Sequence, residues 1–269
     1  MFDTVLVANR GEIACRVLRA ARELGLRTVA VYSDADAGAP HVHAADRAVR
    51  LGPAPASESY LRVDAVLSAA AATGAGAVHP GCGFLAEHAG FARACERSGI
   101  VFVGPTPEQI ELFGDKQAAR AVATAAGIPP VPGSGLLPDA EAAVAAAERL
   151  GYPVVLKVVG GGGGVGMRAC SDAGAVRAAF GAVTRQATAA FGSAAVFCER
   201  YLGRVRHVEV QLFGDGAGRV VTLGTRDCTL QRHHQKIVEE APAPALPTAL
   251  EDQLLRAART LAPAVSYRS

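Results

Sequence analysis

Five consecutive glycines, Gly160–Gly164, separate two strand-like segments of this 269-residue chain. The first segment, residues 153–159, is apolar except for Lys157, and the second covers residues 167–170. Strand, glycine loop and strand in this order predict a β-hairpin, which differs from a P-loop, whose glycines lead into a helix. Glycine loses more backbone freedom on folding than any other residue, so the run indicates close approach of the backbone to a bulky ligand. Freed N–H groups beside the Lys157 ammonium favour an anion such as a nucleotide phosphate tail.

The first hundred residues have the strand and helix alternation of a parallel α/β sheet. Residues 4–9 and 28–32 are strand-like, with a helical pattern of apolar residues between them. This β-α-β start predicts parallel strands joined by a right-handed crossover, and further strands are expected at 77–79 and 100–103. The first turn, residues 9–12, lacks the Gly-x-Gly-x-x-Gly pattern, which argues against a dinucleotide site despite the Rossmann-like order.

The rest of the sequence predicts a small α+β lid and then an antiparallel part. Residues 128–133, rich in Pro and Gly, indicate a hinge, after which two helices, the glycine-loop hairpin and a strand at 196–199 would form the lid. Strands are expected at 205–213 and 219–223. The predicted domains are a Rossmann-like N-terminal domain at 1–112, a linker helix and a lid with a glycine-rich flap at 113–203, and the start of an antiparallel α+β domain at 204–269.

Composition and charge exclude several classes of function. The 27 basic and 25 acidic residues leave a net charge of +2, aromatic residues make up 5% and Trp is absent, so neither a nucleic acid nor a membrane surface is indicated as a partner. No signal peptide or membrane-spanning run is visible. The six cysteines are scattered without a Cys-x-x-Cys pair, which disfavours zinc or disulfides and favours free thiols in the cytoplasm.

Two polar features are candidate binding residues, each with a plain structural alternative. Lys157 would be costly if unpaired in an apolar strand, so it either faces water at a sheet edge or meets an anion, and the adjacent glycines favour the anion. The polar run 226–236 is either a solvated loop or an anion pocket, and its cations, amides and thiol favour the pocket. Cys228 lacks the spacing signature of a nucleophile, while adjacent His233 and His234 would point apart on a strand, which disfavours a shared metal.

Alternation in the strand expected at 205–213 places His207, Glu209 and Gln211 on one face. A half-exposed antiparallel strand explains Glu209 and Gln211 without any binding role. His207 is left open between a structural and a functional interpretation.

Seven stretches of the sequence have the residues and spacing of a known enzyme family. They are residues 7–14, 79–87, 114–116, 157–168, 199–202, 206–209 and 226–244. By these stretches the chain resembles the biotin carboxylase component of biotin-dependent carboxylases, which belong to the ATP-grasp superfamily. The resemblance covers nearly the whole chain, and its last stretch is highly specific.

The resemblance implies ATP-dependent carboxylation of biotin by bicarbonate. ATP would activate bicarbonate as carboxyphosphate, whose CO2 passes to the ureido nitrogen of biotin on a carrier, with Mg2+ assisting phosphoryl transfer. Lys236 would face bicarbonate, and a biotin carboxyl carrier domain, a carboxyltransferase subunit and a second copy of the chain are implied partners. The implied ATP contacts are Lys116, Lys157, Gly163, Gly164, Glu199, Arg200, Tyr201, Leu202, His207, Gln231 and His234.

The sequence departs from the family pattern at three positions. Val165 stands where Arg is usual in the flap, Cys82 where Tyr is usual, and Thr225 where Glu is common. The family's metal-binding glutamates, Glu-x-Asn block and catalytic arginine would lie beyond Ser269, so no metal ligand is assigned within the chain. We therefore expect the chain by itself to bind nucleotide weakly and not to carboxylate biotin.

Two other interpretations stay open. Another ATP-grasp ligase, such as a carbamoyl-phosphate synthetase-like enzyme, would share the lysines and the flap but not the Gln-Arg-His-His-Gln-Lys run at 231–236. A non-catalytic nucleotide-binding or assembly module would bind ATP without turnover. The acyl acceptor is not indicated, because acetyl-CoA, propionyl-CoA, pyruvate and urea carboxylases share this module.

Overall fold

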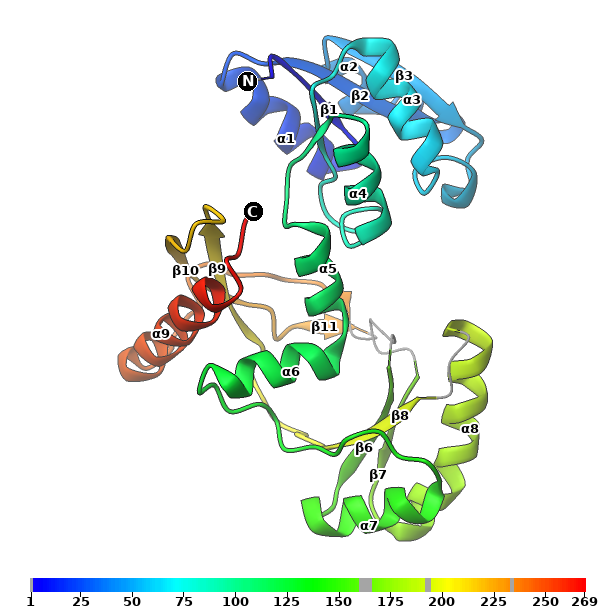
Figure 1. Cartoon of the computed structure of the whole chain (residues 1–269), viewed down its shortest axis with the longest axis vertical. Coiled ribbons are helices and arrows are strands. Elements are labelled where there is room, and N and C mark those ends of the chain that lie inside the picture. Colours follow the sequence, from blue (N-terminus) through cyan, green and yellow to red (C-terminus); the bar gives the residue numbers. More distant parts are fainter. Residues whose placement is uncertain (1, 160–165, 192–194, 233–234) are drawn as a thin grey trace. The chain divides into compact units, whose positions relative to one another are not determined.

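The structure, a computed structural model, describes residues 2–159, 166–191, 195–232 and 235–269 (Figure 1). The chain divides into two compact units. Unit 1 comprises Met1–Glu111 with Arg268–Ser269, and unit 2 comprises Leu112–Tyr267. In the described part of the chain, no helix has the length and apolar character needed to cross a membrane.

Unit 1 is built on a five-stranded sheet of order β3-β2-β1-β4-β5, in which every neighbouring pair is parallel. The prediction of a parallel sheet is therefore confirmed. The strands are β1 (Thr4–Val7), β2 (Arg27–Ser33), β3 (Arg47–Gly52), β4 (Ala77–His79) and β5 (Val101–Phe102). The helices are α1 (Gly11–Glu23), α2 (Pro40–Ala44), α3 (Val63–Thr73) and α4 (Ala89–Arg97), with short 3-10 turns at Asp34–Asp36 and Ala56–Glu58.

Alternation along β1 explains why helices cover both faces of this sheet. Leu6 belongs to the core formed with α3 and α4, whereas Val5 and Val7 pack with Ala21 and Leu18 of α1. All of them are buried. Such burial on both faces is typical of parallel sheets, and it explains the unbroken apolar run in the sequence.

The carboxyl ends of β1 and β4, neighbours in the sheet, are joined by one buried side chain. Asn9 Nδ2 donates to Pro80 O at 2.8 Å and to Cys82 O at 2.9 Å. Gly81 lies between these two carbonyls with φ +69°, and a Cβ added there would lie 2.6 Å from Asn9 Nδ2. Gly81 is therefore required both by its backbone conformation and by the close approach of Asn9.

Replacing Gly81 by alanine tests this account of the loop. Gly83 has the same φ of +69° but open space where a methyl group would lie, so Gly83→Ala serves as the matched control. A non-glycine residue at such a φ costs about 1–2 kcal/mol, which both variants share. Overpacking against Asn9 should cost Gly81→Ala about 1–3 kcal/mol more. Thermal and urea unfolding measure the difference, and equal losses in the two variants would contradict the account.

Unit 2 begins with helices and a small lid. Helix α5 (Pro107–Gly114) contains the division between the units and precedes α6 (Lys116–Ala125). The lid consists of α7 (Ala140–Leu150), β6 (Val154–Val158), β7 (Met167–Cys170), α8 (Ala173–Phe191) and β8 (Val196–Arg200). Its strands lie in the order β7-β6-β8, and α7 and α8 pack side by side against them (Figure 1). Because Lys157 pairs with Met167 in antiparallel register, the predicted hairpin is confirmed, although the glycine run itself lies outside the described residues.

The last part of unit 2 is antiparallel, as predicted, with boundaries that differ from the sequence-based ones. It consists of β9 (Val208–Gly214), β10 (Val220–Asp227), β11 (Gln231–Arg232), β12 (Gln235–Lys236) and α9 (Thr248–Ala264), which packs on β9 and β10. The prediction that the second strand ends at residue 223 was wrong. Gly224, at φ +103°, lies in a register shift between Thr222 and Thr225, so a bulge takes up the glycine and the strand continues.

Candidate functional site

Lys157, on the β6–β7 hairpin, pairs with a carboxylate that also binds a second cation. Lys157 of β6 and Glu199 of β8 come from neighbouring strands, and Lys157 Nζ donates to Glu199 Oε2. Arg120 of α6 donates through Nη1 to the other oxygen, Glu199 Oε1. The Glu199 side chain is only 10% exposed. A single buried carboxylate therefore fixes two cations, and we call Lys116, Arg120, Lys157 and Glu199 the lid cluster.

Lys116, the first residue of α6, adds another positive charge to this cluster. Burial lowers the pKa of Lys116 below its ordinary value, and the neighbouring Lys157 ammonium lowers it further, while Glu199 acts in the opposite direction. Three cations and one carboxylate leave the lid cluster with a net positive charge. Such a group favours an anion with several oxygens, since a further anionic ligand would offset the repulsion between the lysines.

A cavity of about 210 Å³ adjoins the lid cluster. Its lining combines the charged pair Lys157 and Glu199 with apolar and aromatic side chains. The remaining lining residues are Val131, Val155, Met167, Arg200, Tyr201 and Leu202. A cavity lined by apolar, aromatic and charged side chains suits a ligand that has a flat, poorly charged body and an anionic tail.

Glu209 of β9 is the centre of a second group. Lys236 Nζ and Arg226 Nη2 both donate to the Glu209 carboxylate, and His207 Nε2 lies 3.1 Å from Glu209 Oε1. Arg226 is also paired with Glu239, with 3.0 Å between Nε and Oε2. We call these five residues the hairpin cluster, because Lys236 lies on the β11–β12 hairpin. The interpretation of Glu209 as an ordinary residue of a half-exposed strand was therefore incomplete.

The charges in the hairpin cluster hold one another in their ionised forms. Burial alone raises the pKa of Glu209, but the hydrogen bonds from Lys236 and Arg226 outweigh it and lower the pKa to about 2. The hydrogen bond with Glu209 raises the pKa of Lys236. Lys236 is thus a fixed cation at neutral pH, which suits a group that binds a small anion and not one that transfers a proton.

Two further residues predicted for the site, His207 and Gln231, lie together. Gln231 Nε2 lies 2.8 Å from His207 Nδ1 and donates to Cys228 O at 2.8 Å. His207 precedes β9 and is outside the strand in which the sequence placed it, because its N–H donates to Thr229 Oγ1 and not to a neighbouring strand. Burial raises the pKa of the Cys228 thiol, which agrees with the absence of a nucleophile signature there.

All lysines of the chain belong to the two clusters, which was not predicted from the sequence. The chain has 24 arginines but only three lysines, Lys116, Lys157 and Lys236. Two of them are in the lid cluster and the third is in the hairpin cluster. A plain count of lysines against arginines would have singled out these three positions.

The lysines can be titrated separately, and we expect Lys116 and Lys236 to differ in pKa. With ¹³C-lysine labelling, the Cε resonances of three residues are followed by NMR as the pH rises. Lys116 should lose its proton below the ordinary lysine pKa and Lys236 above it, for the reasons of burial and of pairing with Glu209. Anion binding that depends on Lys116 should therefore weaken first as the pH rises. A pKa of Lys116 equal to or above that of Lys236 would contradict this order. Lys157→Gln should raise the pKa of Lys116, because it removes a neighbouring positive charge.

The structure brings together many, but not all, of the residues that the sequence predicted. Lys157, Glu199, Arg200, Tyr201 and Leu202 line one cavity, beside Lys116. Gly163, Gly164, Val165 and His234 lie outside the described residues. Arg120 was missed, because nothing in its helix distinguishes it from a solvated arginine before the pairing with Glu199 is seen.

Cys82 and Thr225, the other two positions at which the sequence departs from the family pattern, lie among the residues that the structure describes. Cys82 is exposed, and its carbonyl accepts the hydrogen bond from Asn9 described above. Thr225 is buried on β10, where its hydroxyl donates to Glu251 Oε1 at 3.2 Å and accepts from the N–H of Ala243 at 3.2 Å. A short hydroxyl side chain therefore connects β10 to α9 and to the segment after β12.

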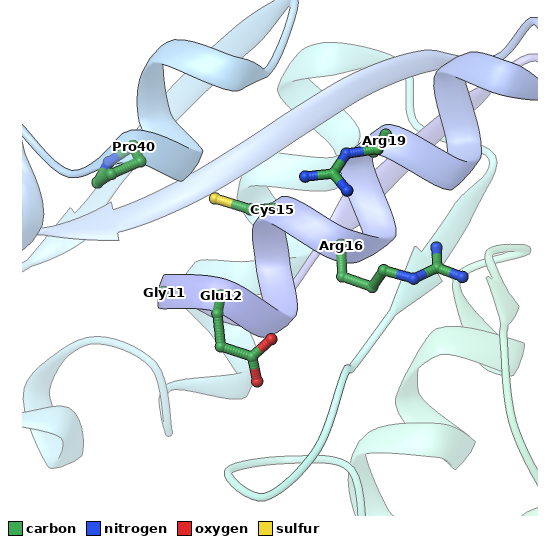
Figure 2. A pocket seen from close by; sticks show the side chains of 6 residues that line it. All are labelled: Gly11, Glu12, Cys15, Arg16, Arg19 and Pro40. Atoms are coloured by element: carbon green, nitrogen blue, oxygen red, sulfur yellow. The ribbon is translucent and has the colours of Figure 1, made fainter. Parts of the chain in front are cut away.

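Unit 1 has a larger hollow of a different kind, of about 420 Å³ beside α1. Figure 2 shows its lining residues, among them Glu12, Cys15, Arg16 and Arg19 of α1 and Pro40 of α2. Neither Arg16 nor Arg19 has an ion-pair or hydrogen-bond partner for its side chain within the part of the chain that the structure describes. The hollow mixes both signs of charge without a convergent set of donors, so we place the candidate site in unit 2.

No metal site is formed by the residues that the structure describes. Among them, no group of three or more His, Cys, Asp or Glu side chains could hold a metal ion. The carboxylates Glu199 and Glu209 are each occupied by two cationic side chains. The described residues thus fit an anionic ligand and do not fit a magnesium ion bound by protein carboxylates alone.

Comparison with known families matches nearly the whole chain. Residues 1–110 match the family described as "Biotin carboxylase, N-terminal domain". Residues 115–269 match the family described as "Carbamoyl-phosphate synthase L chain, ATP binding domain". The boundary between the two matches lies close to the division between units 1 and 2.

Similar proteins share both parts. A biotin carboxylase of Pseudomonas aeruginosa is 54% identical over 248 residues, which are 91% of this chain and 55% of that protein. The biotin carboxylase–beta-gamma-ATP complex from Campylobacter jejuni matches with a TM-score of 0.95 and 41% identity, over 100% of this chain and 60% of that one.

A third similar structure contains bound ligands. It is the biotin carboxylase domain dimer of the Hydrogenobacter thermophilus 2-oxoglutarate carboxylase, in complex with MgADP, ADP and bicarbonate. It matches with a TM-score of 0.93 and 44% identity, over 100% of this chain and 59% of that one. The chain thus spans between 55% and 60% of the length of these three relatives.

Proposed function

The chain belongs to the biotin carboxylase family, and from this membership we propose that the full-length protein carboxylates biotin with bicarbonate at the expense of ATP. The observation that carries the proposal is the placement of the chain's three lysines. Two lie beside an apolar cavity that suits a nucleotide, and the third lies in a cluster that suits a small anion. Both substrates of the proposed reaction, ATP and bicarbonate, carry negative charge.

ATP is proposed to bind with its phosphates at the lid cluster and its base in the adjoining cavity. Lys116 and Lys157 would neutralise phosphate oxygens as point charges, while Glu199 keeps Lys157 in position. The side chains Arg200, Tyr201 and Leu202 would surround the adenine. Gly163 and Gly164 are proposed to cover the phosphates, and His207, Gln231 and His234 to complete the nucleotide site.

Bicarbonate is proposed to bind at Lys236. The reaction begins when a bicarbonate oxygen forms a bond to the γ-phosphorus of ATP and the bond to the ADP oxygen breaks, which yields carboxyphosphate and ADP. Carboxyphosphate then breaks into CO2 and phosphate, and the CO2 forms a bond to the ureido nitrogen of biotin, whose proton passes to the released phosphate. The protein's part is positioning and charge neutralisation, because both reactants are anions that repel each other.

Magnesium would supply further charge neutralisation on the phosphates when bound. The described residues provide no protein site for it, so no step of the proposed reaction is assigned to it. Lys116, Lys157 and Lys236, together with the arginines of the two clusters, are the cations that the described residues contribute.

We also propose the domain organisation, the partners and the cellular compartment of the protein. We assign residues 1–112, 113–203 and 204–269 to a Rossmann-like domain, a linker with the ATP-grasp lid, and an antiparallel part. A biotin carboxyl carrier domain, a carboxyltransferase subunit and a second copy of the chain are the proposed partners, and the relative from H. thermophilus, described as a domain dimer, supports the last. Six free cysteines favour the reducing cytoplasm.

Hydrolysis of ATP by the full-length protein tests the proposal. It should depend on bicarbonate and be stimulated by free biotin, with ADP and phosphate formed in equal amounts. Stimulation by ammonia or glutamine in place of biotin would instead support a carbamoyl-phosphate synthetase-like ligase. ATP binding with no bicarbonate-dependent turnover would overturn the proposal in favour of a nucleotide-binding module.

A further inference from the structure

We propose that Asp227 is a positioning residue, which together with Arg206 holds the turn between β10 and β11 so that the His207–Gln231 pair and Lys236 keep their places. The inference rests on the proposed function, because it assigns those three residues a shared task. Asp227 itself lies outside the hairpin cluster and would touch neither substrate.

Asp227 is buried, and both of its carboxylate oxygens accept hydrogen bonds. Its Oδ2 accepts from Arg206 Nε at 2.9 Å and from Arg206 Nη2 at 2.7 Å, and its Oδ1 accepts from the N–H of Thr229 at 2.8 Å. The hydrogen bonds with Thr229, and then that with Arg206, lower the pKa of Asp227 to about 2. The carboxylate is therefore ionised at any physiological pH, and it joins the segment before β9 to the end of β10.

Arg206 extends this connection to a third segment. Its Nη2 also donates to Pro244 O at 2.6 Å, and its Nη1 donates to Ala245 O at 3.4 Å. The backbone of Asp227 is tied to the same region, because Asp227 N donates to Glu240 O at 2.8 Å and Glu240 N donates to Asp227 O at 3.0 Å. Three segments that are distant in sequence thus meet at one ion pair.

The turn held by Asp227 carries the residues of the proposed site. Thr229 Oγ1 accepts from His207 N at 2.9 Å, and Cys228 N donates to His207 O at 2.7 Å. Cys228 O in turn accepts from Gln231 Nε2, which contacts the His207 ring. Loss of the Asp227 carboxylate would free the turn on which both partners of the His207–Gln231 pair depend.

The same turn leads directly into the hairpin that holds Lys236. Gln231 pairs with Lys236 across β11 and β12, and Leu230 O accepts from Ile237 N at 2.9 Å. A shift of the turn would therefore move Lys236 relative to Glu209. A misplacement of about 1 Å at a reacting group can cost about 10²-fold in rate.

Asp227→Asn in the full-length protein tests the inference, with Asp215→Asn as the matched control. Asp215 also pairs with an arginine, Arg219, and also accepts from backbone N–H groups, but it lies in the β9–β10 turn. We expect Asp227→Asn to lower kcat of bicarbonate-dependent ATP hydrolysis by about 30–100-fold and to raise KM for ATP by a smaller factor. KM for ATP should rise because His207 and Gln231 are proposed nucleotide contacts, and it should rise less than kcat falls because Lys116 and Lys157, which lie on other elements, stay in place. Asp215→Asn should leave both constants unchanged.

A milder pair of variants covers the case in which Asp227→Asn does not fold. Thr229→Val removes the hydroxyl that accepts from His207 N, whereas Thr229→Ser keeps it, so only the valine variant should lose turnover. Equal turnover in the valine and serine variants, or an unchanged kcat in folded Asp227→Asn, would overturn the positioning role. So would a loss of turnover that Asp215→Asn shares.

Amide hydrogen exchange separates this inference from the proposed function. In Asp227→Asn, but not in Asp215→Asn, the amides of Cys228 and Thr229 should exchange at least about 10-fold faster than in the parent protein. If the parent protein shows no bicarbonate-dependent turnover, the proposed function fails, and faster exchange at these amides still supports the structural half of the inference. Unchanged exchange there overturns the inference whatever the activity.

Discussion

Replacing Lys236 by glutamine is expected to lower kcat of bicarbonate-dependent ATP hydrolysis by about 10²–10³-fold, the loss typical when one preorganised charge-stabilising donor is removed. The effect is large because Lys236 is the lysine of the hairpin cluster, and its pairing with Glu209 keeps it charged and in place. The fold should survive, since Glu209 keeps Arg226 as a partner after the change. Steady-state kinetics at varied bicarbonate concentration measure the loss.

Arg219→Gln is the matched control for this variant. Arg219 forms an ion pair with Asp215 in the turn between β9 and β10, but its side chain is 90% exposed and it belongs to neither cluster. Its replacement should leave kcat within about 2-fold of the parent value, as expected for an exposed pair. Comparable losses in the two variants would mean that Lys236 has only a structural role.

The second large effect is expected on nucleotide affinity. Lys157→Gln should weaken ATP binding by about 10–100-fold, because hydrogen bonds to a charged group contribute about 1.5–3 kcal/mol. Lys157 is one of two lysines at the lid cluster, and its position in the middle of β6 aims a charge at the adjoining cavity. Glu199 is not left unpaired, since Arg120 still donates to it. Calorimetric titration with ATP on the folded variant measures the change.

A lid arginine provides the control for Lys157→Gln. Arg177 of α8 pairs with Glu141 of α7, also within the lid but with both side chains at least half exposed. Arg177→Gln should bind ATP with the affinity of the parent protein. If both variants weaken binding equally, general destabilisation of the lid explains the loss and the phosphate role of Lys157 is rejected.

The elements that sequence periodicity predicted well are those whose pattern is local. The parallel start of unit 1 followed from unbroken apolar strands, and the β6–β7 hairpin followed from two strands around the glycine run. The end of β10 could not be predicted, because Gly224 is equally compatible with a strand end and with a bulge. Only the pairing of Thr225 with Val210 beyond the glycine distinguishes these two possibilities.

The lysines of the candidate site could be predicted from the sequence, but their ion-pair contacts with carboxylates could not. Lys157 and Lys236 stood out by their surroundings in the sequence, whereas Glu209 was indistinguishable from a solvated residue on an alternating strand. Its partner Lys236 is 27 residues away, and Arg120 lies 79 residues before Glu199. Contacts of this range depend on the tertiary fold, and the same holds for Asp227 and Arg206. Shared motifs identified the family where periodicity could not.

The origin of an oxygen atom tests the central claim, that this protein activates bicarbonate with the γ-phosphate of ATP. The full-length protein is incubated with ATP, biotin and ¹⁸O-labelled bicarbonate, and the phosphate released is analysed by mass spectrometry. If bicarbonate attacks the γ-phosphorus, the phosphate retains one oxygen from bicarbonate in each turnover. Phosphate that carries oxygen from water alone would contradict the account, because it would mean that ATP is hydrolysed without formation of carboxyphosphate.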